Sequence, residues 1–295
     1  MNRRPAILLA VLAAGALLVL CAGPFMGRPV ISPAEAFGPE TGVEHGILTQ
    51  IRIPRVLAAF LAGAALAVSG MAFQALFRNP LATPFTLGVS SGASLGVAVY
   101  VWLGLSLSLP WLSGVTLFAF GGALAAILLV YGLTRLRRGA STATLLLAGV
   151  AVSFFCSSLI LFIQYLSDYA NSYRILHWLM GGLDVMGYDA VLSMLPLVTA
   201  GCAVVWYLTH ELNLLTTGED LAASRGVEVK KTQRLLFFAT SLMIGGVVAF
   251  CGPIGFVGMM APHMCRLMIG SNHRHLLPAT LMFGGLFLVV CDTLA

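Results

Sequence analysis

The side chains able to do chemistry are few, and their spacing matches no catalytic or metal-binding motif. His263, His273 and His275 lie close together in the sequence, but no HExxH pair and no cluster of carboxylates accompanies them. The glycine-rich segment 251–258 lacks the GxxxxGK(S/T) pattern of a phosphate-binding loop. The six cysteines form neither a CxxC pair nor a Cys/His metal spacing. We therefore predict no catalytic residue, no metal site, no cofactor and no ATP hydrolysis in this chain.

The elements that position these side chains are predicted to lie in a membrane. Of the 295 residues, 59% are hydrophobic and only 9% are charged, and the mean hydropathy is +0.96. A soluble domain carries about 25% charged residues, so this chain has too few for a water-facing surface. The composition excludes a soluble enzyme, a nucleic-acid-binding protein and a disordered chain. The net charge of +5 is interpreted as a topology signal.

Apolar runs predict a single all-α, polytopic transmembrane domain over residues 1–295. A helix that crosses about 30 Å of hydrocarbon needs roughly 20 apolar residues, and the runs lack the alternation of a β-barrel. Gly252-Pro253 divides one long run into a full crossing and a shorter one. Nine crossings are predicted, within residues 5–27, 56–77, 79–134 (two, with a turn near Leu109-Pro110-Trp111), 139–167, 190–209, 235–265 (two) and 276–291.

The positive residues predict which side each connection occupies. With the N-terminus in the cytoplasm and alternating sides, 12 Lys and Arg residues fall inside and only 4 fall outside. This positive-inside bias supports both the number of crossings and their direction. It predicts that Ala295 lies on the outer side. The four outer residues are Arg28, Arg52, Arg55 and Arg174.

The cytoplasmic loop 211–234 is predicted to contain a short amphipathic helix. Thr217 offers a hydroxyl cap for its N-terminus, and Glu219 and Asp220 fall in its first turn. Arg225-Gly226 is typical of a helix end. From residue chemistry alone, this helix is either a simple connector or a docking surface for a soluble partner.

Two groups at the outer ends of crossings each have two interpretations. Arg52 and Arg55 flank Pro54, which favours a helix start. They either anchor lipid phosphates or form a basic patch that receives acidic residues of an external partner. Arg174 and His177 precede a glycine pair that predicts a helix break. An arginine there is either an interfacial anchor or a contact for an anionic substrate that passes through a cavity.

Further candidates could line a pathway. Trp178 and Met180 lie beside the predicted break, and Ser90 and Ser91 lie among glycines spaced four residues apart in 88–96. For the serines, close helix packing is the simpler interpretation and pathway lining the alternative. The predicted crossings lack the carboxylates at their centres that ion-coupled carriers need, which disfavours a secondary transporter. A non-transporting membrane scaffold is the remaining alternative.

Eight motifs, in order along nearly the whole chain, resemble one known family. They are similar to permease subunits of bacterial ABC importers for iron-siderophores, haem and cobalamin, the FecCD/BtuC family. The motifs are Arg52-Ile53-Pro54-Arg55-Val56-Leu57, residues 63–70, 74–82, 87–93 and 146–150, Trp178-Leu179-Met180-Gly181-Gly182, residues 252–258 and Ala261-Pro262-His263.

The resemblance implies the type II importer fold, with ten transmembrane helices. Its partners would be a second permease copy, or a similar subunit, two cytoplasmic ATPase subunits that bind ATP and Mg²⁺, and a periplasmic binding protein. The complex would carry an iron chelate, haem or cobalamin across the inner membrane. Family members continue past Ala295 with the rest of the ninth helix and a tenth. We therefore expect about nine helices here, with the family's C-terminal helix missing.

The resemblance also implies roles for particular residues. Arg52 and Arg55 match arginines that pair with acidic residues of the binding protein. The stretch from Arg174 to Gly182 matches the region that begins to line the pathway. The inner loop matches the coupling helices that sit in a groove of the ATPase, through Gly218, Glu219, Asp220, Leu221, Ala222, Arg225 and Gly226.

Overall fold

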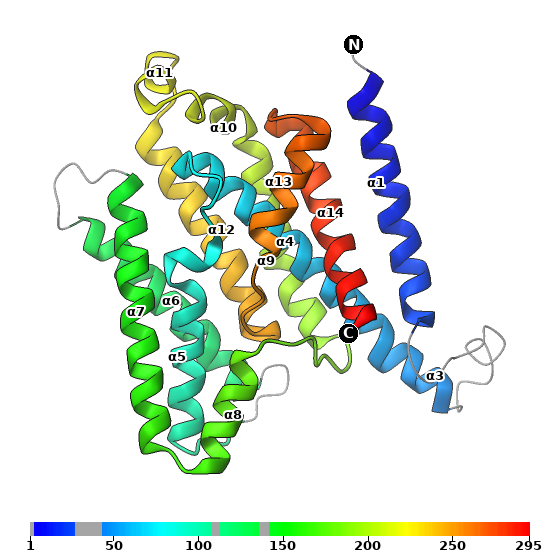
Figure 1. Cartoon of the computed structure of the whole chain (residues 1–295), viewed down its shortest axis with the longest axis vertical. Coiled ribbons are helices and arrows are strands. Elements are labelled where there is room, and N and C mark those ends of the chain that lie inside the picture. The colour runs from blue at the N-terminus through cyan, green and yellow to red at the C-terminus, as the bar shows by residue number, and fades with distance from the viewer. Residues whose placement is uncertain (1–2, 27–42, 108–112, 136–141) are drawn as a thin grey trace.

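A computed structural model of the protein describes residues 3–26, 43–107, 113–135 and 142–295. These residues form a bundle of helices, most of which run between two ends of the molecule (Figure 1). Seven helical segments are long and apolar enough to cross a membrane. Their principal helices are α1 (Arg3–Ala22), α4 (Ile53–Phe77), α6 (Gly114–Arg135), α7 (Thr142–Leu166), α9 (Asp189–Tyr207), α12 (Val229–Cys251) and α14 (His273–Leu294).

The two remaining predicted crossings correspond to shorter helices. α5 (Val89–Trp102) has 14 residues and α13 (Val257–Ile269) has 13. At 1.5 Å per residue, each is about 20 Å long, which is less than the hydrocarbon thickness. The predicted all-α class is confirmed, and a helix overlaps each of the nine predicted crossings. The predicted turn near residues 109–111 lies outside the described residues.

The second crossing begins earlier than the pattern predicts. α4 starts at Ile53 with Pro54 in its first turn, as expected. However, it continues a helical run formed by α3 (Val43–Ile47) and a π-helical turn (Leu48–Arg52). The wider π turn connects the two segments without a loop. The helical run therefore begins before the apolar residues from which the crossing was predicted.

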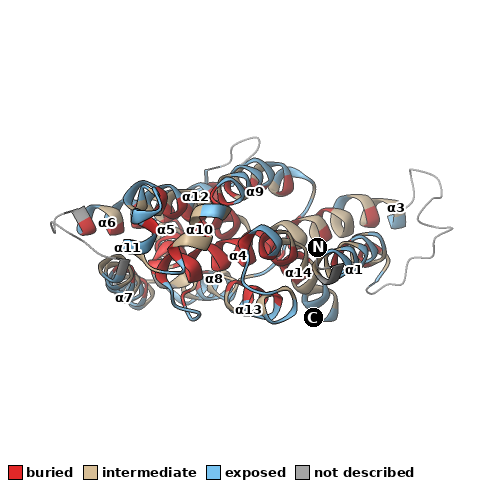
Figure 2. Cartoon of the chain, turned by 90° about the horizontal axis from the view of Figure 1, so that it is seen from above, coloured by how far each residue is buried: buried red, intermediate tan, exposed pale blue. Residues whose placement is uncertain are grey.

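α4 is the central helix of the bundle. Of its 25 residues, 20 are buried, and they lie among the residues that gather in the middle of the molecule (Figure 2). Glycines allow neighbouring backbones to approach α4. A Cβ atom on Gly63 would lie 2.2 Å from the Gly284 carbonyl oxygen of α14, and one on Gly70 would lie 1.7 Å from that of Gly258 in α13. Close packing of backbones is how helices associate where water provides no driving force.

The peripheral helices present apolar side chains outward. Phe154, Phe155 and Phe162 of α7 and Leu192 of α9 are exposed. A soluble protein would not tolerate such faces, but a bilayer or a second apolar surface covers them. Their exposure is consistent with the membrane class predicted from composition.

The molecule has two distinct ends. The start of α1 lies at the same end as α10 (Thr209–Leu215) and α11 (Glu219–Ser224), while α3 and α8 (Tyr169–Leu179) lie at the opposite end (Figure 1). The predicted alternation of sides requires this arrangement. We call the end with α11 the inner end and the end with α8 the outer end.

Candidate functional site

At the inner end, residues 209–228 form the inner segment, which contains α10 and α11. Leu212 and Leu215 of α10 and Ala222 of α11 are buried, so one face of the segment is fixed to the bundle. Asp220, Leu221, Arg225 and Gly226 are exposed on its other face. Ala222 therefore holds the helix in place, whereas its neighbours are available to another molecule.

The ends of α11 depend on two glycines. Gly218 is the N-cap at φ +128°, and Gly226 follows the helix at φ +88°, backbone conformations that favour glycine. The end predicted at Arg225-Gly226 is confirmed. The predicted hydroxyl cap is wrong, because the Thr217 Oγ1 donates to the Leu214 carbonyl instead of capping α11. Glycine backbone freedom, and not a side-chain hydrogen bond, sets this helix start.

Glu219 connects α11 to its neighbours. The Gln233 Nε2 atom of α12 donates to the Glu219 Oε1 at 3.1 Å, and the Arg78 guanidinium at the end of α4 lies 4.0 Å from the same oxygen. Arg78 adopts φ +49° in the turn predicted after α4, where the Asn79 side chain accepts a hydrogen bond from the Leu81 backbone. The Glu219 ion pair is more than one-third exposed and is therefore weak.

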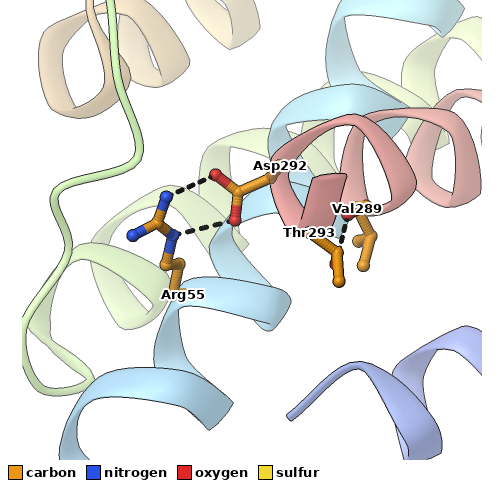
Figure 3. A network of polar contacts seen from close by, with 4 residues as sticks. All are labelled: Arg55, Val289, Asp292 and Thr293. Atoms are coloured by element: carbon orange, nitrogen blue, oxygen red, sulfur yellow. Dashed lines mark hydrogen bonds and ion pairs between the residues drawn. The ribbon is translucent and has the colours of Figure 1, made fainter. Parts of the chain in front are cut away.

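At the outer end, Arg55 forms an ion pair that the sequence did not reveal. Its Nε and Nη2 atoms each donate to an oxygen of Asp292 at 2.8 Å, a bidentate pair between α4 and α14 (Figure 3). The Asp292 side chain is only 14% exposed and that of Arg55 is 41% exposed. Arg52 donates from Nη1 to the Pro24 carbonyl at 3.3 Å. Both candidate docking arginines are thus held by contacts within the chain.

The two predicted helix breaks pack against each other near the outer end. α8 ends at Leu179, and α12 ends at Cys251 before the irregular residues Gly252 to Phe256. The Gly182 amide donates to the Cys251 carbonyl at 2.9 Å, and a Cβ on Gly181 would lie 2.5 Å from the Pro253 carbonyl oxygen. Both breaks were predicted, but the sequence gave no sign of their contact.

This contact separates two cavities. The larger, about 490 Å³, is lined by His177 and Trp178 of α8 together with Ser113, Asp184 and Asp189. The smaller, about 270 Å³, is lined by Met180, the two glycine breaks and Asp292 of the outer ion pair. Three of the predicted pathway residues, His177, Trp178 and Met180, therefore line cavities at the outer end.

The remaining pathway candidates line neither cavity. Arg174 is exposed on α8. Ser90 is buried in α5, with its hydroxyl unpaired among the described residues, and Ser91 is half-buried. A pathway role for these three stays a prediction. Within the described residues, no group of three His, Cys, Asp or Glu side chains could hold a metal ion.

Comparison with known proteins gives a consistent result. Residues 6–295 match the FecCD transport family. The chain is 41% identical to the ABC transporter permease protein YvrB of Bacillus subtilis, over 88% of this chain and 74% of that protein. It is 40% identical to the vitamin B12 import system permease protein BtuC of Klebsiella pneumoniae, over 95% of this chain and 81% of BtuC. It is 39% identical to the hemin transport system permease protein HmuU of Yersinia pestis, over 84% of this chain and 75% of HmuU.

The fold is also similar to a solved structure, an inward-facing conformation of a metal-chelate type ABC transporter. The TM-score is 0.87 at 29% sequence identity, over 97% of this chain and 89% of the other. Sequence and fold thus agree over nearly the whole length described here. The chain belongs to the FecCD transport family and is a multi-pass permease subunit of an ABC importer, not an enzyme.

Proposed function

We propose that this permease carries a large chelate, either cobalamin, haem or an iron-siderophore complex, across the bacterial inner membrane. The support is the identity of about 40% to permeases named for vitamin B12 and hemin. Energy for transport comes from ATP bound with Mg²⁺ in partner ATPase subunits, whose binding shifts the population between two access states. The N-terminus lies in the cytoplasm, as the distribution of positive residues supports.

The ATPase docks on the inner segment. The observation that carries this proposal is the short helix α11, which projects at the inner end with Asp220, Leu221 and Arg225 exposed while Ala222 is buried (Figure 1). An exposed leucine flanked by charged side chains offers a soluble partner an apolar contact with a polar rim. Gly218 and Gly226 fix where the helix begins and ends, so they set how it is presented.

A periplasmic binding protein docks on the outer end at Arg52 and Arg55. Arg55 is 41% exposed even in its ion pair, so part of the guanidinium can meet an acidic side chain of the partner. Cargo released there meets the cavity lined by His177 and Trp178, with Met180 beside it and Arg174, Ser90 and Ser91 as further candidate contacts. A second copy of the chain completes the pathway, and the exposed phenylalanines of α7 offer it an apolar surface.

Uptake by reconstituted vesicles tests this function. The permease, its ATPase and its binding protein are placed in liposomes, and uptake of labelled cyanocobalamin, of haemin and of an iron-siderophore complex is compared. We expect ATP-dependent uptake of one probe, and loss of that uptake with a hydrolysis-deficient ATPase. Uptake that persists with the deficient ATPase, or that follows an ion gradient without ATP, contradicts the proposal and favours an ion-coupled carrier.

A further inference from the structure

α14 is held by polar contacts at both of its ends. One end contacts the inner segment, and the other contacts Arg55 at the outer end. Its first residue, His273, contacts the inner segment through Asn213 of α10. Near its other end, Asp292 holds Arg55 at the outer face. With 22 residues, the helix is about 33 Å long and connects the two faces directly.

The inner junction consists of Asn213, Asn272 and His273. The Asn213 Oδ1 atom accepts from the His273 backbone amide at 2.9 Å and lies 2.7 Å from the His273 Nδ1. The Asn213 Nδ2 donates to the Asn272 Oδ1 at 3.2 Å, and Asn272 also caps α14 by accepting from the Arg274 amide. His273 is 2% exposed, so this junction is anchored in the protein interior. A displacement of α10 would therefore move the start of α14.

The contacts of Glu219 are a weaker route out of the inner segment. The Arg78–Glu219 distance of 4.0 Å exceeds hydrogen-bonding range, and both side chains are more than one-third exposed. The junction at Asn213, by contrast, makes its three contacts at 2.7 to 3.2 Å. Gln233 of α12 also donates to Glu219 at 3.1 Å, but the shortest polar contact described between the inner segment and α4, α12 or α14 is that of Asn213 with His273, at 2.7 Å.

The middle of α14 leaves little room for independent motion. A Cβ on Gly284 would lie 2.3 Å from the Ala67 Cβ of α4, and one on Gly285 would lie 2.6 Å from the ring of Phe60. Packed interfaces of this kind shift between discrete arrangements and do not deform continuously. A shift of α14 at His273 would therefore reach Asp292 as a change from one packing against α4 to another.

The outer ion pair leaves one edge of Arg55 available. Asp292 occupies the Nε and Nη2 atoms, while the Nη1 nitrogen points away from the carboxylate (Figure 3). A guanidinium can present two edges to two carboxylates. Any shift of Asp292 therefore turns the edge of Arg55 that faces the outside.

We propose that α14 couples the ATPase surface to the binding-protein surface. Asn213 of α10, which contacts the first residue of α14, and Asp292, near the last, are the positioning residues. Docking at Arg55 and the nucleotide state at α11 then influence each other, since coupling between two binding sites is reciprocal. This inference rests on the proposed function of the two surfaces. It adds the element that connects them.

Cys291, which precedes Asp292 and is exposed, provides a reporter at the outer end. Cys21 is the other exposed cysteine and is replaced by serine, while the remaining four are buried or half-buried. The permease–ATPase complex in lipid nanodiscs is treated with a water-soluble maleimide, with and without Mg-ATP and vanadate. We expect nucleotide to change the modification rate of Cys291 by about five-fold or more, within the usual range of coupling between sites.

Asn213→Ala should reduce this change to less than about two-fold, which is below the usual range of such coupling. Asn213→Asp, which keeps both acceptor contacts with His273, should restore most of it. His273→Phe removes the ring contact from the α14 side and should show a loss in the same direction, without altering the inner segment. The matched control is Thr209→Ala in the same helix as Asn213, because the Thr209 hydroxyl donates to the Trp206 carbonyl and, among the described contacts, reaches no residue of α14.

Two results overturn the inference. One is an unchanged Cys291 rate on addition of nucleotide to the unsubstituted complex. The other is a nucleotide effect that survives in both Asn213→Ala and His273→Phe. Either result leaves the proposed function standing if the same complex still drives ATP-dependent uptake, so the two failures are distinguishable. Thr293→Val serves as the control beside Asp292, since among the described residues the Thr293 hydroxyl bonds the Val289 carbonyl of its own helix and not Arg55 (Figure 3).

Discussion

The inner and outer ends of this permease are built on different principles. At the inner end, α11 begins and ends at glycines with positive φ, and space around Gly226 is open. At the outer end, glycines serve close approach, with Gly181 against Pro253, and charges pair across 237 residues of sequence. The comparison indicates that the ends of α11 are determined locally by its flanking glycines, whereas the outer end depends on contacts between residues far apart in the sequence.

Substitution at a glycine should have its largest effect at the outer end. Gly181→Ala adds a Cβ that would lie 2.5 Å from a carbonyl oxygen, where φ is +71°. Overpacking and backbone strain together should cost about 3 kcal/mol or more of unfolding free energy. Thermal unfolding of the detergent-purified protein measures the loss.

The matched control is Gly226→Ala at the inner end. Its φ is +88°, but no atom lies within 4 Å of the added Cβ. Only the left-handed backbone conformation is penalised, by about 1–2 kcal/mol. Equal destabilisation by the two substitutions would remove the distinction between the two ends.

The outer ion pair should make a measurable contribution to stability. Asp292→Ala leaves the Arg55 guanidinium without its bidentate partner and should cost about 1–2 kcal/mol, less than a fully buried pair because Arg55 is 41% exposed. A double-mutant cycle with Arg55→Ala measures the pairwise interaction, and Thr293→Val is the control. Strict additivity of the two substitutions would show that the pair contributes no net stability.

The inner ion pair should affect binding more than stability. Glu219→Gln weakens an exposed contact 4.0 Å long and should change the unfolding free energy by less than about 0.5 kcal/mol. Co-purification of the ATPase should nevertheless decrease, because the charge of Glu219 positions α11 against Arg78 of α4, and only the hydrogen bond from Gln233 survives the substitution. If stability falls as far as in Asp292→Ala, the inner end depends on tertiary contacts as the outer end does.

A small effect is also expected at Thr217. Its hydroxyl donates to the Leu214 carbonyl and does not cap α11. Thr217→Ala should therefore cost less than the roughly 1 kcal/mol typical of a lost N-cap. A larger loss, measured by thermal unfolding, would restore Thr217 as the cap residue.

These differences also explain how much the sequence could predict. Crossings, helix breaks and the end of α11 follow from apolar runs, glycine pairs and local spacing, so they were predicted from nearby residues. The start of α11 was misassigned to Thr217, since a hydroxyl before acidic residues resembles a cap and the φ of Gly218 is not visible in a sequence. The partner of Arg55 was missed because Asp292 lies in a different apolar run, although a single carboxylate there was a usable signal. The family resemblance supplied roles that residue chemistry alone left open.

The central claim is that α11 is a cytoplasmic surface covered by a separate motor subunit. The most direct measurement labels Asp220→Cys with a membrane-impermeant maleimide, in a background where Cys21 and Cys291 are replaced by serine. We predict labelling in inside-out membrane vesicles, and protection there when the ATPase is bound. Labelling of intact spheroplasts from the outside, or no protection by the ATPase, would contradict the account.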